Sequence, residues 1–267
     1  MNILLKEGSK GTEVIKLQKL LCDAGYKVLS DGWFGDGTEK AVIKFQKDND
    51  LVVDGIVGPR TFRLLEGKVT TDHALTQQNI IDAAEFLGVE PAAISAVSTV
   101  ESSGSGFLSP GVPKILFERH WMWRRLVTHG FDVDNMWHEH PTIICKKPGG
   151  YQGGHAEQLR LQEAKKIHYQ SAIESASWGR YQIMGFHWEA LGYSSAEEWE
   201  TLMCKNEGEQ LNAFVRFIKN SSPLHNALRK KQWGNFASRY NGPAYKKYSY
   251  DTKMKAAYEK AVEIYSA

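Results

Sequence analysis

The sequence predicts a mainly α-helical protein with two domains, a small three-helix domain and a larger helical domain that includes a short extended or β segment. Three observations support this. An internal repeat marks residues 1–67 as one unit. Residues 68–74 have the polar composition of a linker. Helical periodicity then dominates residues 75–267, apart from a stretch rich in Gly, Pro, His and aromatic residues between 103 and 154, which we expect to be irregular or partly extended.

The composition is that of a globular protein. Of the 267 residues, 42% are hydrophobic and 24% are charged. The formal net charge of +2 is too small to indicate nucleic acid as a partner. A mildly basic protein is nevertheless attracted to anionic surfaces such as a bacterial wall.

Cysteines and the first residues indicate where the chain is made. Cys22, Cys145 and Cys204 are far apart and form no CxxC pair, which fits a reducing compartment. The N-terminus has no secretory pattern, and no apolar run is long enough to cross a bilayer. We therefore expect a monomer that is made in a cytoplasm and is not stably inserted in a membrane.

The repeat in the first domain consists of two Asp-Gly segments. Asp31–Gly35 with Thr38 recurs as Asp54–Gly58 with Thr61. In each copy the Asp-Gly pair predicts a tight turn, the next residues enter the core, and the Thr is expected to cap a helix. The helices expected in this domain are Glu13–Ala24, Thr38–Lys47 and Thr61–Leu65.

Helices of the second domain are expected from apolar periodicity, with boundaries uncertain by a few residues. They are Gln78–Leu87, Pro91–Glu101, His155–Ser175, Glu197–Lys205, Glu207–Asn220, Pro223–Lys230, Trp233–Tyr240 and Tyr248–Tyr265.

The first domain resembles the widespread peptidoglycan-binding three-helix module. The resemblance is carried by Gly8-Ser9-Lys10-Gly11, Leu17-Gln18, the two Asp-Gly turns, Phe45-Gln46 and Gly58-Pro59. It covers residues 5–66 and implies wall anchoring rather than chemistry. The groove between the two Asp-Gly loops is the surface we expect to bind.

Glu101 is the strongest catalytic candidate. It ends an apolar helix and is followed by Ser102-Ser103-Gly104-Ser105-Gly106, so its carboxyl group is expected to be half-buried. Glycoside cleavage needs a proton donor, and an apolar setting raises the pKa of a Glu so that it keeps its proton near neutral pH. A surface Glu at a helix end is the alternative.

Two later motifs strengthen this interpretation. Gly179-Arg180-Tyr181-Gln182-Ile183 offers glycines for close approach and side chains that can stack on a sugar or hydrogen-bond it, and Tyr240-Asn241 ends a helix. With Glu101-Ser102, they resemble the signatures of the goose-type lysozyme and soluble lytic transglycosylase superfamily. The implied substrate-binding residues are Ser102, Tyr181, Gln182, Tyr240 and Asn241.

The stretch from Val97 to Arg125 resembles the muramidase domain of phage endolysins, through Val100-Glu101-Ser102-Ser103-Gly104 and Lys114-Ile115-Leu116-Phe117-Glu118. This resemblance covers residues 75–265. It implies hydrolysis between N-acetylmuramic acid and N-acetylglucosamine in bacterial peptidoglycan, with Glu101 as general acid. It also implies release from the host cytoplasm to the periplasm and wall by a separate membrane-permeabilising protein.

A second catalytic carboxylate is left open. Glu118 could be the base of an inverting enzyme or the nucleophile of a retaining one. Equally, it could pair with Arg119 or another cation in a structural role. A lytic transglycosylase acting on the same bond needs no second carboxylate, but the usual Gly-Leu-Met-Gln is here Gly179-Arg180-Tyr181-Gln182.

Other classes of protein fit less well. A zinc peptidase or amidase would use His138 and His140, but these lie two apart, and there is no HExxH motif. A non-catalytic wall-binding protein would not need an acid in an apolar helix. We therefore expect no metal and no cofactor.

Overall fold

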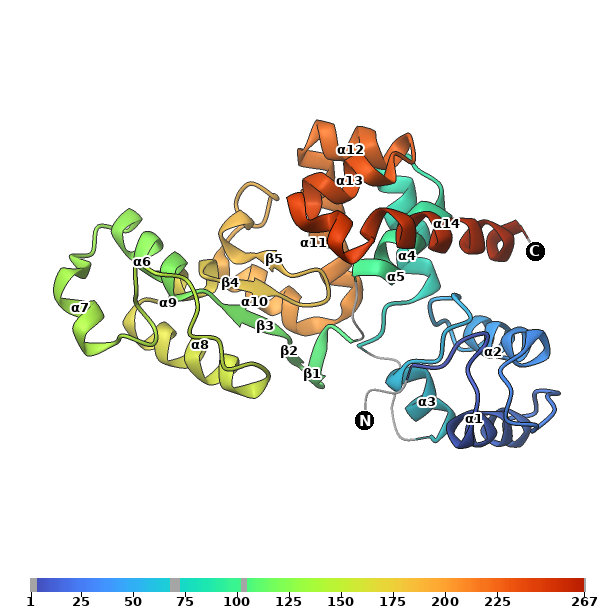
Figure 1. The fold of residues 1–267 in the computed structure, drawn as a ribbon. Coiled ribbons are helices and arrows are strands. Elements are labelled where there is room, and N and C mark those ends of the chain that lie inside the picture. Colours follow the sequence, from blue (N-terminus) through green and yellow to red (C-terminus); the bar gives the residue numbers. More distant parts are fainter. Residues whose placement is uncertain (1–3, 68–72, 102–104, 267) are drawn as a thin grey trace. The chain divides into compact units, whose positions relative to one another are not determined.

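The computed structural model describes residues 4–67, 73–101 and 105–266 (Figure 1). The chain divides into two compact units. The first unit is Met1–Gly104 with Ser221–Ala267, and the second is Ser105–Asn220. Helices make up most of both units, with only short strands between them. The predicted mainly α-helical fold is therefore confirmed.

The N-terminal part of the first unit contains three helices around its own core. These are α1 (Thr12–Asp23), α2 (Asp36–Asp48) and α3 (Pro59–Leu65). Apolar side chains at helical spacing turn inward, and Ala74, from the segment expected to be a linker, also packs there. The buried core residues are Leu5, Val14, Leu17, Leu21, Phe34, Ala41, Val42, Phe45, Leu51, Val57, Phe62 and Ala74.

The first Asp-Gly loop is braced by one buried glutamine. Gln18 accepts a hydrogen bond from the N–H of Gly32 (2.9 Å), and its Nε2 donates to Asp31 (2.9 Å) and to the carbonyl of Trp33 (3.0 Å). Asp31 in turn accepts from the N–H of Trp33 (2.9 Å), which closes the expected turn. The N–H of Trp33 and the side chain of Gln18 lower the pKa of Asp31.

The second loop repeats this brace atom for atom. Gln46 accepts from the N–H of Gly55 (2.9 Å), and its Nε2 donates to Asp54 (2.8 Å) and to the carbonyl of Ile56 (3.1 Å). Asp54 accepts from the N–H of Ile56 at 2.8 Å. The sequence repeat is therefore a repeat of hydrogen bonds, each made by a glutamine of the preceding helix.

The expected threonine caps are wrong. Helices α2 and α3 begin after Gly35 and Gly58, neither of which makes a side-chain cap bond. Thr38 and Thr61 lie inside the first turns and are buried. Thr38 instead accepts a hydrogen bond from Gln18 (3.0 Å), so its hydroxyl serves the loop brace.

The rest of the first unit is helical and is centred on α5 (Pro91–Glu101). Ala92 to Ser98 of α5 are all buried, as expected for a helix that is apolar on every side. The elements around it are α4 (Gln77–Leu87), α12 (Ser222–Arg229), α13 (Trp233–Tyr240), the 3-10 helix η2 (Pro243–Tyr248) and α14 (Tyr250–Ser266). Of these, α14 and α4 pack along α5.

The second unit combines helices with two small sheets. In one sheet, β1 (Phe107–Ser109) pairs with β2 (Val112–Pro113). In the other, β4 (Ala176–Trp178) lies antiparallel between β3 (Ile115–Phe117) and β5 (Ile183–Met184). Its other elements are α6 (Arg119–Thr128), α7 (Val133–Glu139), α8 (His155–Ile167), α9 (Tyr169–Glu174), the 3-10 helix η1 (Gly185–His187), α10 (Ala196–Lys205) and α11 (Glu207–Asn220).

Two local predictions need correction. The helix expected over His155–Ser175 is broken at His168, whose backbone is extended and whose ring accepts the N–H of Ser171 (3.2 Å) to start α9. The stretch expected to be irregular contains α6 and α7 as well as strands. α6 escapes detection because only Met122 and Leu126 of its ten residues are buried.

Candidate active site

Glu101 is the last residue of α5. Its carboxyl group is mostly enclosed, and burial raises its pKa to about 7, against a hydrogen bond from Asn241 that lowers it. Its Oε1 is buried and has no hydrogen-bond partner among the described residues. A carboxyl group in this setting keeps its proton over much of the neutral range.

Asn241 is brought to Glu101 by the end of α13. It is the C-cap residue of that helix, where its N–H bonds to the carbonyl of Ala237 (2.8 Å). Its Nδ2 donates to Oε2 of Glu101 at 2.9 Å. Because Oε2 accepts this bond, Oε1 is left as the oxygen available to carry the proton.

Tyr250 is a neighbour of Glu101 that no sequence motif indicates. It is the first residue of α14 and is half-buried. Burial raises its pKa, and the charge of Glu101 raises it further. Its ring also meets that of Tyr248 edge to face. Only the packing of α14 along α5 brings this tyrosine to the carboxyl group.

Two further residues, Tyr240 and Ser102, are expected to bind substrate. Tyr240, the last residue of α13, is half-buried, and its ring stacks on Phe236 at 5.9 Å. Ser102 lies outside the described residues. Substrate binding by Tyr240 and by Ser102 therefore stays a prediction.

Glu118 lies in the second unit, as the N-cap residue of α6. Tyr151 donates its hydroxyl to both carboxylate oxygens, at 3.0 and 2.8 Å, and Nδ1 of His120 lies 3.1 Å from Oε2. Arg119 instead donates to backbone carbonyls, among them that of Lys147 (3.1 Å). The basic side chain that lies beside Glu118 is therefore the imidazole of His120, and not the guanidinium of Arg119.

Gln182 and Tyr181 lie in the turn between β4 and β5. Gln182 has a positive φ of 51°, is exposed, and bonds within the hairpin, accepting from Ser177 (2.7 Å) and donating to the carbonyl of Gly179 (2.8 Å). Tyr181 is only 3% exposed, and its ring stacks on Phe214 at 4.5 Å. The ring of Tyr181 therefore packs in the core of its unit, and sugar stacking by it stays a prediction.

Gly179 is required at this turn. Its φ is +69°, and a Cβ there would come within 2.3 Å of Cδ of Gln210. Gln210 accepts the N–H of Arg180 at 2.7 Å. Gly179 therefore allows the backbone to approach Gln210 closely, as the motif predicts.

Arg180 stands where the superfamily pattern Gly-Leu-Met-Gln has leucine. Its guanidinium lies beside a buried carboxylate. Its Nη1 lies 3.3 Å from Oε2 of Glu207, which is 1% exposed. The other oxygen of Glu207 accepts the N–H of Gly106 (2.6 Å) and the hydroxyl of Ser105 (3.1 Å). Glu207 was not predicted from the sequence. Its carboxylate holds Ser105 and Gly106 by hydrogen bonds.

Comparison with known proteins assigns the family. Residues 90–262 match the N-acetylmuramidase family, and residues 10–65 match the putative peptidoglycan-binding domain family. The chain belongs to the N-acetylmuramidase family. This match confirms the predicted enzyme class, a glycoside hydrolase of the lysozyme type that carries an N-terminal wall-binding module.

A solved structure resembles this muramidase over nearly its whole length. The crystal structure of Burkholderia AP3 phage endolysin has 41% sequence identity and a TM-score of 0.92, covering 98% of this chain and 100% of that one. The predicted resemblance to modular endolysins is therefore confirmed.

Two curated relatives match a short part of the chain. A probable N-acetylmuramoyl-L-alanine amidase of Bacillus licheniformis is 44% identical over 66 residues, which is 24% of this chain and 19% of that protein. The zinc D-Ala-D-Ala carboxypeptidase of Streptomyces albus G is 43% identical over 61 residues, 22% of this chain and 24% of that protein. The chain spans about a fifth of the length of these relatives.

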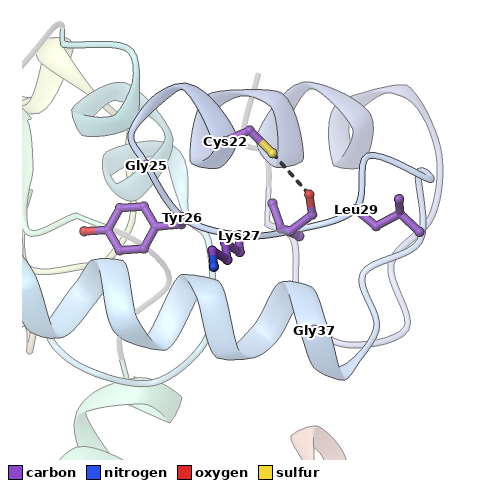
Figure 2. Close-up of a pocket in the computed structure, with 7 residues that line it drawn as sticks. Cys22, Gly25, Tyr26, Lys27, Leu29 and Gly37 are labelled. Carbon is purple, nitrogen blue, oxygen red and sulfur yellow. Dashed lines mark hydrogen bonds between the residues drawn. The ribbon is translucent and has the colours of Figure 1, made fainter.

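The binding module has an open depression of about 670 Å³ between α1 and α2 (Figure 2). Cys22 at its edge donates to the carbonyl of Val28 (3.1 Å), and Tyr26 donates to Asp48 (2.9 Å). Its lining residues are Cys22, Gly25, Tyr26, Lys27, Val28, Leu29 and Gly37.

The part of the muramidase that the structure describes contains neither a metal-ligand cluster nor a membrane span. Within residues 4–67, 73–101 and 105–266, no three His, Cys, Asp or Glu side chains are grouped so that they could hold a metal ion. Over the same residues, no helix is both long and apolar enough to cross a bilayer.

Proposed function

We propose that this muramidase is an endolysin that cleaves the bond between N-acetylmuramic acid and N-acetylglucosamine in peptidoglycan, with Glu101 as general acid. The buried carboxyl group of Glu101, with its pKa near 7 and one oxygen held by Asn241, carries the proposal. Oε1 gives its proton to the departing glycosidic oxygen, and the carboxylate left behind is stabilised by the Asn241 amide.

The second half of the reaction needs a group that acts on the sugar carbon. Glu118 is the candidate, because Tyr151 holds its carboxylate by two short contacts near the start of α6. As a base it would activate water, and as a nucleophile it would form a glycosyl-enzyme. In a lytic transglycosylase the 6-hydroxyl of the sugar attacks instead, and Glu118 is structural.

The N-terminal module binds the wall and raises the local concentration of the muramidase domain on its insoluble substrate. The enzyme acts as a monomer, reaching the periplasm and wall from the host cytoplasm through a separate membrane-permeabilising protein. The domain bounds follow the composition of the chain, with binding in 1–67, a linker at 68–74 and catalysis in 75–267.

Glu101→Gln tests the proposal, because it keeps the shape of the side chain and removes the proton. Release of reducing ends from purified sacculi should fall by about a thousandfold or more. Glu85→Gln, the same change on an exposed position of α4, is the matched control and should leave the rate unchanged. Equal rates for Glu101→Gln and the parent protein would disprove the role of Glu101.

Mass spectrometry of the soluble products distinguishes hydrolysis of the glycosidic bond from transglycosylation. A hydrolase leaves reducing N-acetylmuramic acid, whereas a transglycosylase leaves an anhydro sugar that is lighter by one water. A peptidase or amidase would free amino groups and leave the glycan intact.

A further inference from the structure

Trp33 is the feature that distinguishes the first Asp-Gly loop from the second. In both loops the glutamine bonds the glycine N–H, the aspartate and the next carbonyl, yet the position after Asp-Gly is Trp33 in one loop and Ile56 in the other. Trp33 is 55% exposed, whereas Ile56 is half-buried. Since the second loop forms without an indole, the indole of Trp33 is not needed to build the loop.

The indole lies against the backbone of its own loop and near a cation. A Cβ at Gly35 would lie 3.7 Å from three atoms of the ring, which is ordinary van der Waals contact. Lys10 pairs with Trp33 as an isolated β-bridge, and its Nζ lies 5.7 Å from the ring centroid. A rigid, half-exposed aromatic ring with an adjacent ammonium group is a suitable surface for an anionic carbohydrate polymer.

We propose that Trp33 is a binding site for the glycan strand of peptidoglycan, stacking on the apolar face of an N-acetylhexosamine ring, with Lys10 attracting the carboxylates of the attached stem peptides. The proposal rests on the proposed function, which supplies the polymer, and deepens it by assigning wall binding to one loop. A flat, rigid indole matches the flat C–H face of a sugar better than it matches a flexible peptide.

The residues that flank this loop line the depression in the module. Leu29 and Gly37 lie four residues before and four residues after Trp33, and both line it (Figure 2). Leu29 is 75% exposed, and a Cβ at Gly37 would meet no atom within 4 Å. The segment from Leu29 to Gly37 thus carries a flat ring and borders an open hollow.

Trp33→Ile tests the site, because it gives the first loop the residue that the second loop already carries. The full-length chain with Glu101→Gln is mixed with purified sacculi and with glycan strands stripped of peptide by an amidase. Binding to both should weaken about tenfold. Ile56→Ala, at the matched position, should change binding by less than about twofold.

Three further measurements make the test decisive. Trp33→Phe keeps a flat ring and should retain most of the binding. Lys10→Ala should weaken binding to intact sacculi, and added salt should remove the difference between this variant and the parent protein. Thermal unfolding of each variant should match that of the parent.

Unchanged binding of a folded Trp33→Ile to stripped strands would overturn the proposal. Loss of binding to intact sacculi alone would also overturn it, because the stem peptide would then be the ligand. Release of reducing ends by the parent protein is measured separately, so a failed muramidase assignment is distinguishable from a failed binding site.

Discussion

Asn241 and Glu101 are joined by a single hydrogen bond of 2.9 Å from Nδ2 to Oε2, although 140 positions separate them in the chain. The bond links the ends of α13 and α5. It favours the ionised form of Glu101, while burial opposes that form more strongly. The acid strength of the proposed proton donor is set by the balance between these two effects.

This balance predicts the pH dependence of the reaction. The parent rate should fall as pH rises through about 7, where Glu101 loses its proton. Asn241→Ala removes the contact that lowers the pKa, so the alkaline limb of the pH–rate profile should move to higher pH while the maximal rate falls. Rates on solubilised glycan between pH 5 and 9 measure both, and an alkaline limb that moved to lower pH would contradict the geometry.

The free energy of unfolding should also depend on pH through the carboxyl group of Glu101. The folded pKa of Glu101 is raised from 4.5 to about 7, so the parent loses stability as pH rises between these values and recovers none above them. Glu101→Gln avoids this cost. It should be more stable than the parent at pH 8, by up to about 3 kcal/mol, and equal to it near pH 4. Urea unfolding at both pH values checks the difference.

Arg125 should be essential to the second unit. Its Nε donates to Oε2 of buried Glu174 at 2.6 Å. Burial alone would raise the pKa of Glu174, but the hydrogen bonds from Arg125 and its other partners lower it to about 2. Arg125→Met leaves the charge without its strongest partner and should cost about 3 kcal/mol at pH 7.

The pH dependence of this effect has a definite sign. Because the folded pKa of Glu174 lies below the ordinary 4.5, its stabilisation is present above pH 4.5 and is lost as pH falls toward 2. The parent and Arg125→Met should therefore converge in stability in strong acid. Arg124→Met, one residue earlier and exposed, is the control and should have little effect at either pH.

Tyr151→Phe separates the two roles proposed for Glu118. The substitution removes the hydroxyl that donates to both carboxylate oxygens and so leaves the carboxylate less well positioned. If Glu118 acts as base or nucleophile, the rate of reducing-end release should fall by about tenfold or more while thermal unfolding changes little. A structural Glu118 predicts an unchanged rate and a small loss of stability.

The fold was largely predictable because most of its helices carry regular apolar patterns. α5 was located to the residue, since its apolar run begins at Pro91 and ends at Glu101. α6 was missed because its burial is confined to two positions, and the break at His168 depends on a local side-chain bond rather than on periodicity.

For the candidate site, sequence reasoning found the residues that belong to recognisable motifs. Glu101 and Asn241 were both named, and the structure joins them. Tyr250 and Glu207 were not, because each matters through a contact with a distant segment that no local pattern announces. The position of Tyr181 under Phe214 likewise follows from tertiary packing alone.

The paired glutamines, Gln18 and Gln46, separate the construction of each loop from the choice of residue at its tip. Apart from the bond of Gln18 to Thr38, the bonds of the brace are made to backbone groups or to the aspartate of the turn, so the side chain that follows the glycine takes no part in holding the loop. On the proposal that Trp33 binds the glycan, exchanging that one residue offers a way to retarget the enzyme to walls of different chemistry while its scaffold stays intact.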